Sequence, residues 1–184
     1  MVANHLLVLA GPTAVGKGTV ARYIVDHNPD VQLSVSATTR SARPGEIDGV
    51  HYFFLTDAEF DALIADGQML EYAVVHGTHR YGTPKAPVEE ALVQGKNVLL
   101  EIDIQGARQV KQALPEAITV FLAPPSWDEL VRRLEGRGTE NAEQQARRLE
   151  TAREELAAQG EFDHVLINDE VAKCAAEVVE LLKS

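Results

Sequence analysis

The sequence contains little that would indicate an extracellular, membrane-bound or nucleic-acid-binding protein. One cysteine, Cys174, stands among 184 residues, so no internal disulfide can form, which suits a reducing compartment. No apolar run approaches the roughly 20 residues that span a bilayer. Positive charge is scarce: 17 Lys and Arg face 28 Asp and Glu, and the net charge of −11 opposes binding to nucleic acids and anionic membranes. We therefore expect a cytoplasmic protein with neither nucleic acid nor membrane as partner.

The stretch GPTAVGKGT, residues 11–19, is the most informative feature that is present. The short apolar run at residues 6–10 has no basic leader and predicts a core strand rather than a signal peptide. A helix-compatible run follows, so unpaired backbone N–H groups and the positive end of a helix dipole would face an anion. Lys17 adds a charge that reaches the outer phosphates of a nucleotide. The alternative, a chance glycine-rich turn, is disfavoured by these flanks.

One position of this stretch departs from the full phosphate-loop motif. The motif has Ser or Thr directly after the lysine, where the hydroxyl contacts Mg²⁺. This chain has Gly18 there and places Thr19 one residue later. The way in which a metal ion would be held is therefore open.

Apolar runs and turn residues predict strands alternating with helices along the chain. The expected strands are 6–10, 31–35, 51–55, 69–75, 97–103, 118–122 and 165–167. The expected helices are 19–25, 57–64 with Asp57 as its cap, 87–93, 106–114, 126–134 with a capping box, a long one to about 158, and 171–182. This alternation predicts a mostly parallel sheet covered on both faces. Residues 36–84 break it, with loops expected at 36–49 and 77–84, and predict an inserted lobe.

Asp103 is expected to close an apolar strand, where open α/β sheets bind their ligands. An acidic residue there can hold the water shell of Mg²⁺ or a donor group of the ligand. The alternative is the N-cap of the helix that follows.

Arg40 and Arg43 lie three residues apart in a polar loop, where guanidinium groups match phosphate oxygens bidentately. Solvated surface arginines are the alternative. Tyr52 and Tyr81 could donate to the same phosphate or could be half-buried packing residues. The carboxylate of Glu71 accepts hydrogen bonds only, which suits a base with adjacent N–H donors, such as guanine. Its alternative is a solvent-facing strand position.

A cluster of arginines, Arg133, Arg137, Arg147 and Arg148, could close over a triphosphate and neutralise the transferring group. The alternative is ordinary pairing with glutamates one helical turn away. The sequence shows neither a nucleophile–base spacing nor a metal-ligand cluster. This agrees with phosphoryl transfer to an anionic acceptor, which needs positioning and charge neutralisation.

Six blocks, which occur in the family's order over nearly the whole chain, together resemble the guanylate kinases. They are GPTAVGKGT, SVSATTRSARPGEIDGVHYFF, LEYAVVHGTHRYGT, VLLEIDIQGARQVK, FLAPPSWDELVRRLEGRGTE and VLINDE. The resemblance implies a three-layer P-loop NTPase fold within one domain of about residues 4–182. It implies a P-loop core of residues 1–35, 85–128 and 160–184, a GMP-binding lobe of 36–84 and a lid of 129–159.

The same resemblance implies transfer of the γ-phosphoryl group of ATP to GMP, with Mg²⁺. Implied GMP-binding residues are Ser36, Arg40, Arg43, Tyr52, Glu71, Tyr81, Thr83 and Asp103. Implied ATP-binding residues are Gly11, Pro12, Thr13, Ala14, Val15, Gly16, Lys17, Gly18, Thr19, Arg133, Arg137 and Asn168. Implied catalytic residues are Lys17, Arg40, Arg137 and Arg148. Thr19 would serve the metal directly or through water, and Asp103 through water.

Two departures from the family pattern bear on these assignments. Gly18 replaces the usual Ser, although the G-K-G-T form also looks like the adenylate kinase loop. The HGTHRYGT stretch is about one residue longer than the common pattern, so either Arg80 or Tyr81 could occupy the phosphate-contacting place. Rival functions are a kinase of another small acceptor, such as ribose bisphosphate, and a non-catalytic binding module of guanylate-kinase-like fold. The chain could be a monomer or a homodimer.

Overall fold

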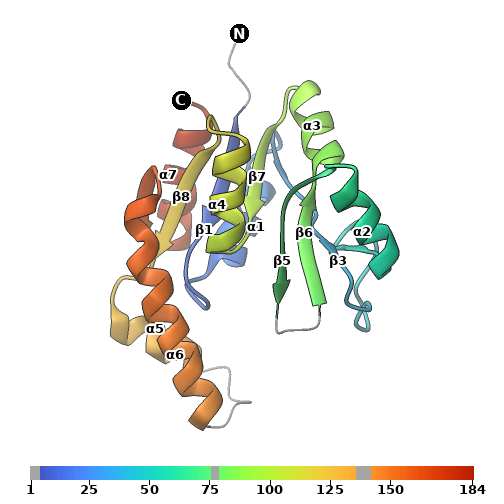
Figure 1. The fold of residues 1–184 in the computed structure, drawn as a ribbon. Helices are drawn as coiled ribbons and strands as arrows, with labels where there is room; N and C mark the ends of the chain where they lie inside the picture. Colours follow the sequence, from blue (N-terminus) through green and yellow to red (C-terminus); the bar gives the residue numbers. More distant parts are fainter. Residues whose placement is uncertain (1–4, 76–78, 136–141) are drawn as a thin grey trace.

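The computed structural model describes residues 5–75, 79–135 and 142–184. A five-stranded sheet forms its centre, in the order β2-β7-β1-β8-β9 (Figure 1). Its strands are β1 Leu6–Ala10, β2 Val31–Leu33, β7 Asn97–Glu101, β8 Ile118–Ala123 and β9 His164–Ile167. Every neighbouring pair is parallel, which confirms the predicted sheet.

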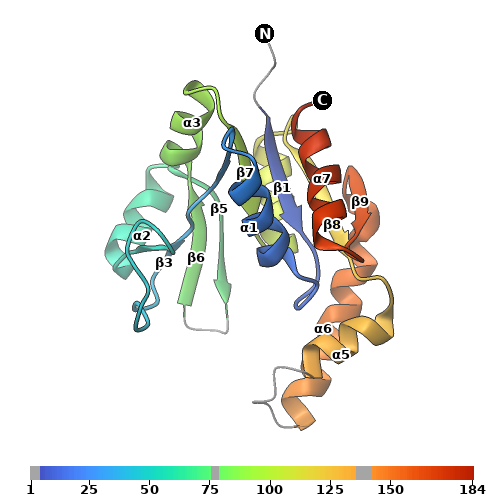
Figure 2. The ribbon, with the colours of Figure 1, turned by 180° about the vertical axis from the view of Figure 1, so that it is seen from behind.

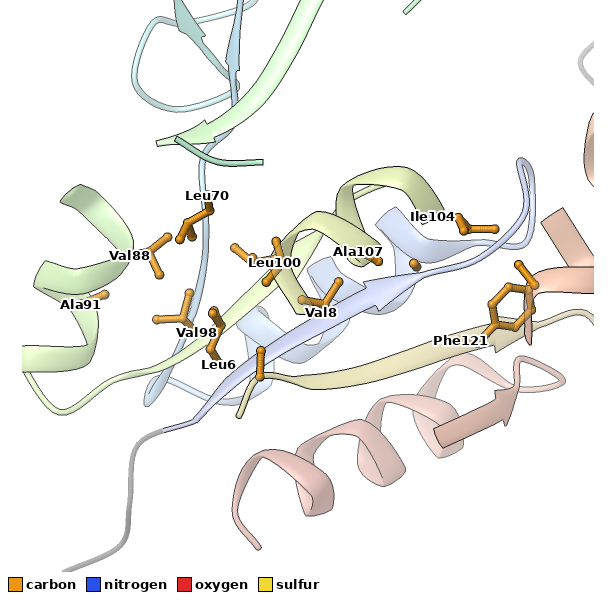
Figure 3. Close-up of a cluster of buried hydrophobic side chains, with 14 of the residues drawn as sticks. Leu6, Val8, Leu70, Val88, Ala91, Val98, Leu100, Ile104, Ala107 and Phe121 are labelled. Carbon is orange, nitrogen blue, oxygen red and sulfur yellow. The ribbon is translucent and has the colours of Figure 1, made fainter. Parts of the chain in front are cut away.

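Helices cover both faces of this sheet, because its strands are apolar on both sides. The helices beside it are α1 Lys17–His27, α3 Lys85–Val93, α4 Ile104–Ala113 and α7 Val171–Leu182. Leu6 and Val8 of β1 face the cluster that contains α4 and α3, shown in Figure 3. Leu7 and Leu9 alternate with them and face α1 and α7, which lie on the opposite face (Figure 2). Alternation along one buried strand therefore builds two cores.

A second sheet lies beside the first and belongs to residues 37–84 (Figure 1). Its order is β4-β3-β6-β5, from β3 Ala37–Thr38, β4 Phe53–Phe54, β5 Met69–Val75 and β6 His79–Pro84. The helix α2 Asp57–Ala65 covers it, with Phe60 fully buried against Ala37 and Met69. A reciprocal pair of hydrogen bonds joins this second sheet to α4, since the Gln109 amide donates to and accepts from the backbone of Tyr72 in β5.

Two expected loops were wrong. Residues 36–49 contain the buried strand β3, and residues 77–84 contain β6. β3 is only two residues long and lies within the polar stretch SATTR, and β6 has the turn-like composition HRYGTP, so the extended backbone is concealed in the sequence. Pairing with neighbouring strands decides their conformation, because β propensity depends on context more than on residue type.

The start of α2 also differs from the expectation. Thr56, rather than Asp57, is the N-cap: its hydroxyl accepts from the Glu59 N–H, and the Glu59 carboxylate accepts from the Thr56 N–H. The expected capping box at Ser126 is half present. Glu129 donates its N–H to the Ser126 hydroxyl, but its carboxylate binds arginines of its own helix.

The remaining helices, α5 Trp127–Glu135 and α6 Ala142–Ala157, extend beyond the carboxyl ends of the main strands (Figures 1 and 2). A short 3₁₀ helix, η1 Ala158–Glu161, leads from α6 to β9. Leu130, Leu134 and Ala152 form a small separate core between α5 and α6. Within the described residues, the helices are all too short or too polar to cross a bilayer.

Candidate active site

The phosphate loop connects β1 to α1 at the carboxyl edge of the main sheet. Gly16 is the N-cap of α1 with φ of 99°, a left-handed conformation that favours glycine. A Cβ atom there would lie 2.7 Å from Nδ2 of Asn168, so space and backbone both exclude a side chain. The Lys17 ammonium donates to the carbonyls of Gly11 at 2.7 Å and Pro12 at 3.3 Å, which holds it above the loop.

Side chains from distant parts of the chain hold this loop from outside. Asn168, after β9, donates from Nδ2 to the Val15 carbonyl at 2.9 Å. Arg133 of α5 donates to the same carbonyl at 3.1 Å, and the Glu155 carboxylate of α6 accepts from the Thr13 N–H at 3.0 Å. Asn168, which the resemblance places beside adenine, thus lies against the loop itself. Its Oδ1 is buried with no hydrogen-bond partner among the described residues.

A cavity of about 270 Å³ opens beside the loop, between the two sheets. It brings together five of the eight predicted GMP-binding residues and three of the twelve predicted ATP-binding residues. Its lining includes Gly11, Thr13, Lys17, Ser36, Tyr52, Glu71, Tyr81, Glu101, Asp103 and Glu155. Residues 36 to 81 come from the small sheet and its loops, and the others come from the core and α6. Phosphate-loop and acceptor-lobe residues therefore share one site.

Within the described part of the chain, Glu71 is the only buried residue other than glycine that lines this cavity, with 6% of its surface exposed, and the part of the cavity beside it is called the inner end below. The Thr83 hydroxyl on the paired strand β6 donates to Glu71 Oε1 at 2.7 Å. Burial raises the pKa of Glu71 to about 7, and the nearby Asp103 charge also raises it, against the hydrogen bond from Thr83. The Glu71 side chain is thus a buried acceptor close to its titration point, rather than a solvent-facing strand residue.

Asp103 occupies the N-cap of α4, where its Oδ1 accepts from the Gly106 N–H at 2.6 Å. The capping alternative is therefore correct, and the residue also lines the cavity. β7 ends at Glu101, so the expected strand to residue 103 was two residues too long. A Cβ atom at Gly106 would lie 2.7 Å from Oε2 of Glu71. Glycine at this position lets the α4 backbone approach the glutamate.

Arg40 is held by a carboxylate that the sequence reasoning did not identify. Its two terminal nitrogens bind Glu46 at 2.8 and 2.9 Å, and its Nε donates to the Tyr81 hydroxyl at 3.3 Å. The Arg40 guanidinium holds the pKa of Glu46 at about 2, with help from the Arg43 N–H. The Tyr52 ring lies 5.5 Å from the Arg40 guanidinium carbon. The side chain of Arg43 is exposed.

The structure distinguishes Tyr81 from Arg80. Tyr81 contacts Arg40, and its ring lies 5.8 Å from that of Tyr52. Arg80 points to α2, where it binds Asp57 at 2.8 Å, pairs with Asp61 and covers Phe60. Tyr81 is therefore the residue beside the candidate acceptor-phosphate site. Residues 76–78, the first three of the HGTHRYGT stretch, lie outside the described residues.

Glu101 is a second functional candidate that the sequence reasoning missed. Its carboxylate lies 3.6–3.7 Å from the position of a Cβ at Gly18, next to the start of α1. Burial raises the pKa of Glu101, and the charge of Lys17 opposes this. The sequence feature that could have identified Glu101 is its position at the end of an apolar run. Glu101 and Tyr52 also line a larger cavity of about 550 Å³, together with Ser34.

The arginine cluster divides into two kinds. Arg133 reaches the phosphate loop, as described above, although it also binds Glu129 at 3.0 Å. Arg147 binds Glu143 at 2.7 Å one turn away on the surface of α6, as the alternative predicted. Arg148 is half-buried on the same helix. Arg137 lies outside the described residues. Thr19 is exposed in the first turn of α1.

Comparisons with known proteins agree with this geometry. The guanylate kinase family model matches residues 3–184. A guanylate kinase of Leifsonia xyli is 65% identical over 179 residues, covering 97% of this chain and 70% of that protein. One of Nocardia farcinica is 60% identical over 182 residues, covering 98% and 94%.

Solved structures show the same fold. The guanylate kinase of Anaplasma phagocytophilum superposes with a TM-score of 0.78 at 31% identity, covering 99% of this chain and 86% of that one. Shikimate kinase of Bacteroides thetaiotaomicron matches with a TM-score of 0.51 at 14% identity, which shows a shared fold alone. The family match extends over nearly the whole chain and the fold and site agree with it, so this protein belongs to the guanylate kinase family.

Proposed function

We propose that this protein transfers the γ-phosphoryl group of ATP to GMP, giving ADP and GDP. The observation that carries the proposal is the buried Glu71–Thr83 pair at the inner end of the cavity that Lys17 also lines. A buried carboxylate accepts two adjacent N–H donors, which guanine presents and adenine does not. Leaving such a group unpaired is costly, so the site selects the base that satisfies it.

The acceptor phosphate would bind between Arg40, Tyr52 and Tyr81, which already contact one another. Arg43 is exposed and would have to turn inward, so its contact with the phosphate would depend on closure of the lobe. Because Glu46 occupies the end of the Arg40 guanidinium, the phosphate would share that arginine with the carboxylate or displace it. Ser36 and Asp103 line the same cavity and would contact the nucleoside.

Within the loop of residues 11–19, the donor nucleotide would place its phosphates on the N–H groups at the start of α1, residues 16–19, with Lys17 beside them. Arg133, Arg137 and Arg148 would act from the lid, residues 129–159, and Asn168 would support the loop. The core would be residues 1–35, 85–128 and 160–184, and the acceptor lobe 36–84. Closure of lobe and lid would exclude water and limit hydrolysis of ATP.

The acceptor oxygen belongs to a phosphate that is already anionic, so catalysis depends on alignment and on neutralising charge. Lys17 and the lid arginines would stabilise the charge of the transferring group, and Arg40 would offset repulsion between the two nucleotides. The two nucleotides would approach in line across the cavity.

Mg²⁺ is the metal that we propose for this reaction, and the oxygen donors at the site suit it. Thr19, Glu101 and Asp103 supply hard oxygen atoms near the loop, and Mg²⁺ uses one or two carboxylates with substrate phosphates and water. Gly18 has no hydroxyl, but Glu101 faces it. When bound, Mg²⁺ would neutralise charge on the transferring phosphoryl group.

Thr19→Val tests the part that the Thr19 hydroxyl has in metal binding. If the hydroxyl serves Mg²⁺ directly or through water, the Mg²⁺ concentration for half-maximal rate should rise a few-fold, the loss expected from a single hydrogen-bond partner. An unchanged Mg²⁺ titration would assign the metal to Glu101 and the substrate phosphates instead.

A coupled ADP-release assay with GMP, AMP, UMP and ribose bisphosphate as acceptors tests the function itself. Activity with GMP that exceeds the others by more than about 100-fold is the expected result, given the cost of an unpaired buried carboxylate. Preference for another acceptor would support the rival kinase, and inactivity with all four would support the binding module. We also propose that the enzyme acts in the cytoplasm, as a monomer or a homodimer.

A further inference from the structure

Three successive residues of the phosphate loop are contacted by the same pair of helices. The Thr13 N–H donates to Glu155 of α6, Ala14 packs against the core between α5 and α6, and Arg133 of α5 donates to the Val15 carbonyl. This part of the loop is the one without glycine. The loop and the helix pair therefore form one contact region.

Ala14 gives a reason why the loop needs such support. Its φ is 67°, and it is the only described non-glycine residue with positive φ. A left-handed conformation costs a residue with a Cβ roughly 1–2 kcal/mol. Strained backbone of this kind persists only where surrounding contacts hold it.

The bond from Thr13 to Glu155 has the features of a structural support. It is 3.0 Å long and joins a backbone donor to a half-buried carboxylate 142 positions away. Burial raises the pKa of Glu155, while the Thr13 N–H and the charge of Lys17 act in the opposite direction. Hydrogen bonds to charged groups are stronger than neutral ones, at roughly 1.5–3 kcal/mol.

We propose that Glu155 is a positioning residue. It holds residues 13–15 of the phosphate loop in their ATP-binding shape and couples that shape to α6. Thr13 precedes the amides at the start of α1, so the bond leaves the helix N-terminus open to phosphate. A loop that is already held in shape loses less entropy when ATP binds. The inference rests on the proposed donor, ATP, and assigns Glu155 no contact with either nucleotide.

The test compares Glu155→Ala, which removes the acceptor, with Glu155→Gln, which keeps an oxygen acceptor and removes the charge. Glu154→Ala is the matched control, since Glu154 is the neighbouring, exposed residue of α6. We expect Glu155→Ala to raise the KM for ATP and the Kd of a non-hydrolysable ATP analogue about tenfold. The KM for GMP of Glu155→Ala should stay within about twofold of the wild-type value. The KM for ATP of Glu155→Gln should stay within about threefold of the wild-type value, and Glu154→Ala should keep the wild-type values.

Three results would overturn the proposal: equal losses for ATP and GMP, a loss in Glu155→Gln as large as in Glu155→Ala, or tighter ATP binding in both variants. The last would mean that the carboxylate repels the triphosphate. If Glu155→Ala fails to fold, Glu155→Asp, which shortens the acceptor by one methylene, should show the same ATP-selective loss. Wild-type GMP-dependent ADP release is measured first. Its absence would reject the proposed function, while analogue binding would still test Glu155.

Discussion

The two ends of the cavity are built on different principles. At the inner end, the substrate recognition that we propose depends on side chains: Glu71 and Thr83 face each other across a strand pair, and Gly106 leaves room for the glutamate. At the phosphate loop, it depends on backbone N–H groups, and the side chains of Glu155, Arg133 and Asn168 hold the backbone in shape. A single substitution at the inner end should therefore strongly weaken the binding of one substrate. A single substitution around the loop should have a smaller effect, except at Lys17.

Lys17→Ala should have the largest effect, because Lys17 is the loop side chain that we propose contacts the ATP phosphates. We expect kcat to fall about 1,000-fold, within the range for removing one preorganised electrostatic group. Circular dichroism and thermal unfolding should show an intact fold, since the lysine is not part of either core. Arg22→Ala on the same helix is the control. Substantial turnover by Lys17→Ala would reject the assignment of the phosphate loop.

Glu71→Gln should have the next largest effect and should be selective. Replacing one carboxylate oxygen by an amide group presents a donor to a donor, so the KM for GMP should rise about 100-fold with ATP affinity unchanged. The free energy of unfolding should not fall at pH 8, because ionising a buried carboxyl of raised pKa costs stability there. Equal losses of GMP and ATP affinity would make Glu71 a structural residue.

Gly106→Ala tests the fit between α4 and Glu71. The new Cβ would lie 2.7 Å from Oε2 of Glu71, so the carboxylate must move. Overpacking of this kind costs typically 1–3 kcal/mol, and we expect the KM for GMP to rise about thirtyfold. Gln105→Ala, at the neighbouring exposed position of the same helix, is the control. GMP kinetics unchanged by Gly106→Ala would show that the inner end tolerates displacement.

The pH dependence of GMP binding should show the smallest effect. The pKa of Glu71 is about 7 in the free protein, and the N–H donors of guanine favour the ionised carboxylate, so binding releases a proton. GMP affinity should therefore rise with pH, and be about tenfold weaker at pH 6 than at pH 8. Glu71→Gln should lose this part of the dependence and keep the part that comes from the GMP phosphate. An identical pH profile in the variant would exclude Glu71 as the titrating group.

Several features could be predicted from the sequence because they depend on residues that are close together along the chain. Glycines and a lysine between an apolar run and a helix predicted the phosphate loop, and alternating runs predicted the parallel sheet. The lobe's own strands were harder to recognise, since β3 is only two residues long and β6 contains turn-forming residues. Their pairing brings Tyr81 to Arg40 and turns Arg80 toward α2. One residue of register decides between the two, because alternate strand residues face opposite sides.

The sequence by itself determined the fold class, the family and most of the residues that line the site, because those features are written in short motifs and in periodicity. The tertiary structure decided the partners of these residues. Glu46 on Arg40, Glu101 beside Gly18 and Glu155 on Thr13 are contacts between carboxylates and groups that the motifs had singled out. In a chain with 28 acidic residues, charge and local pattern do not distinguish these carboxylates from the solvated ones. Burial and distance do, and both arise only when the chain is folded.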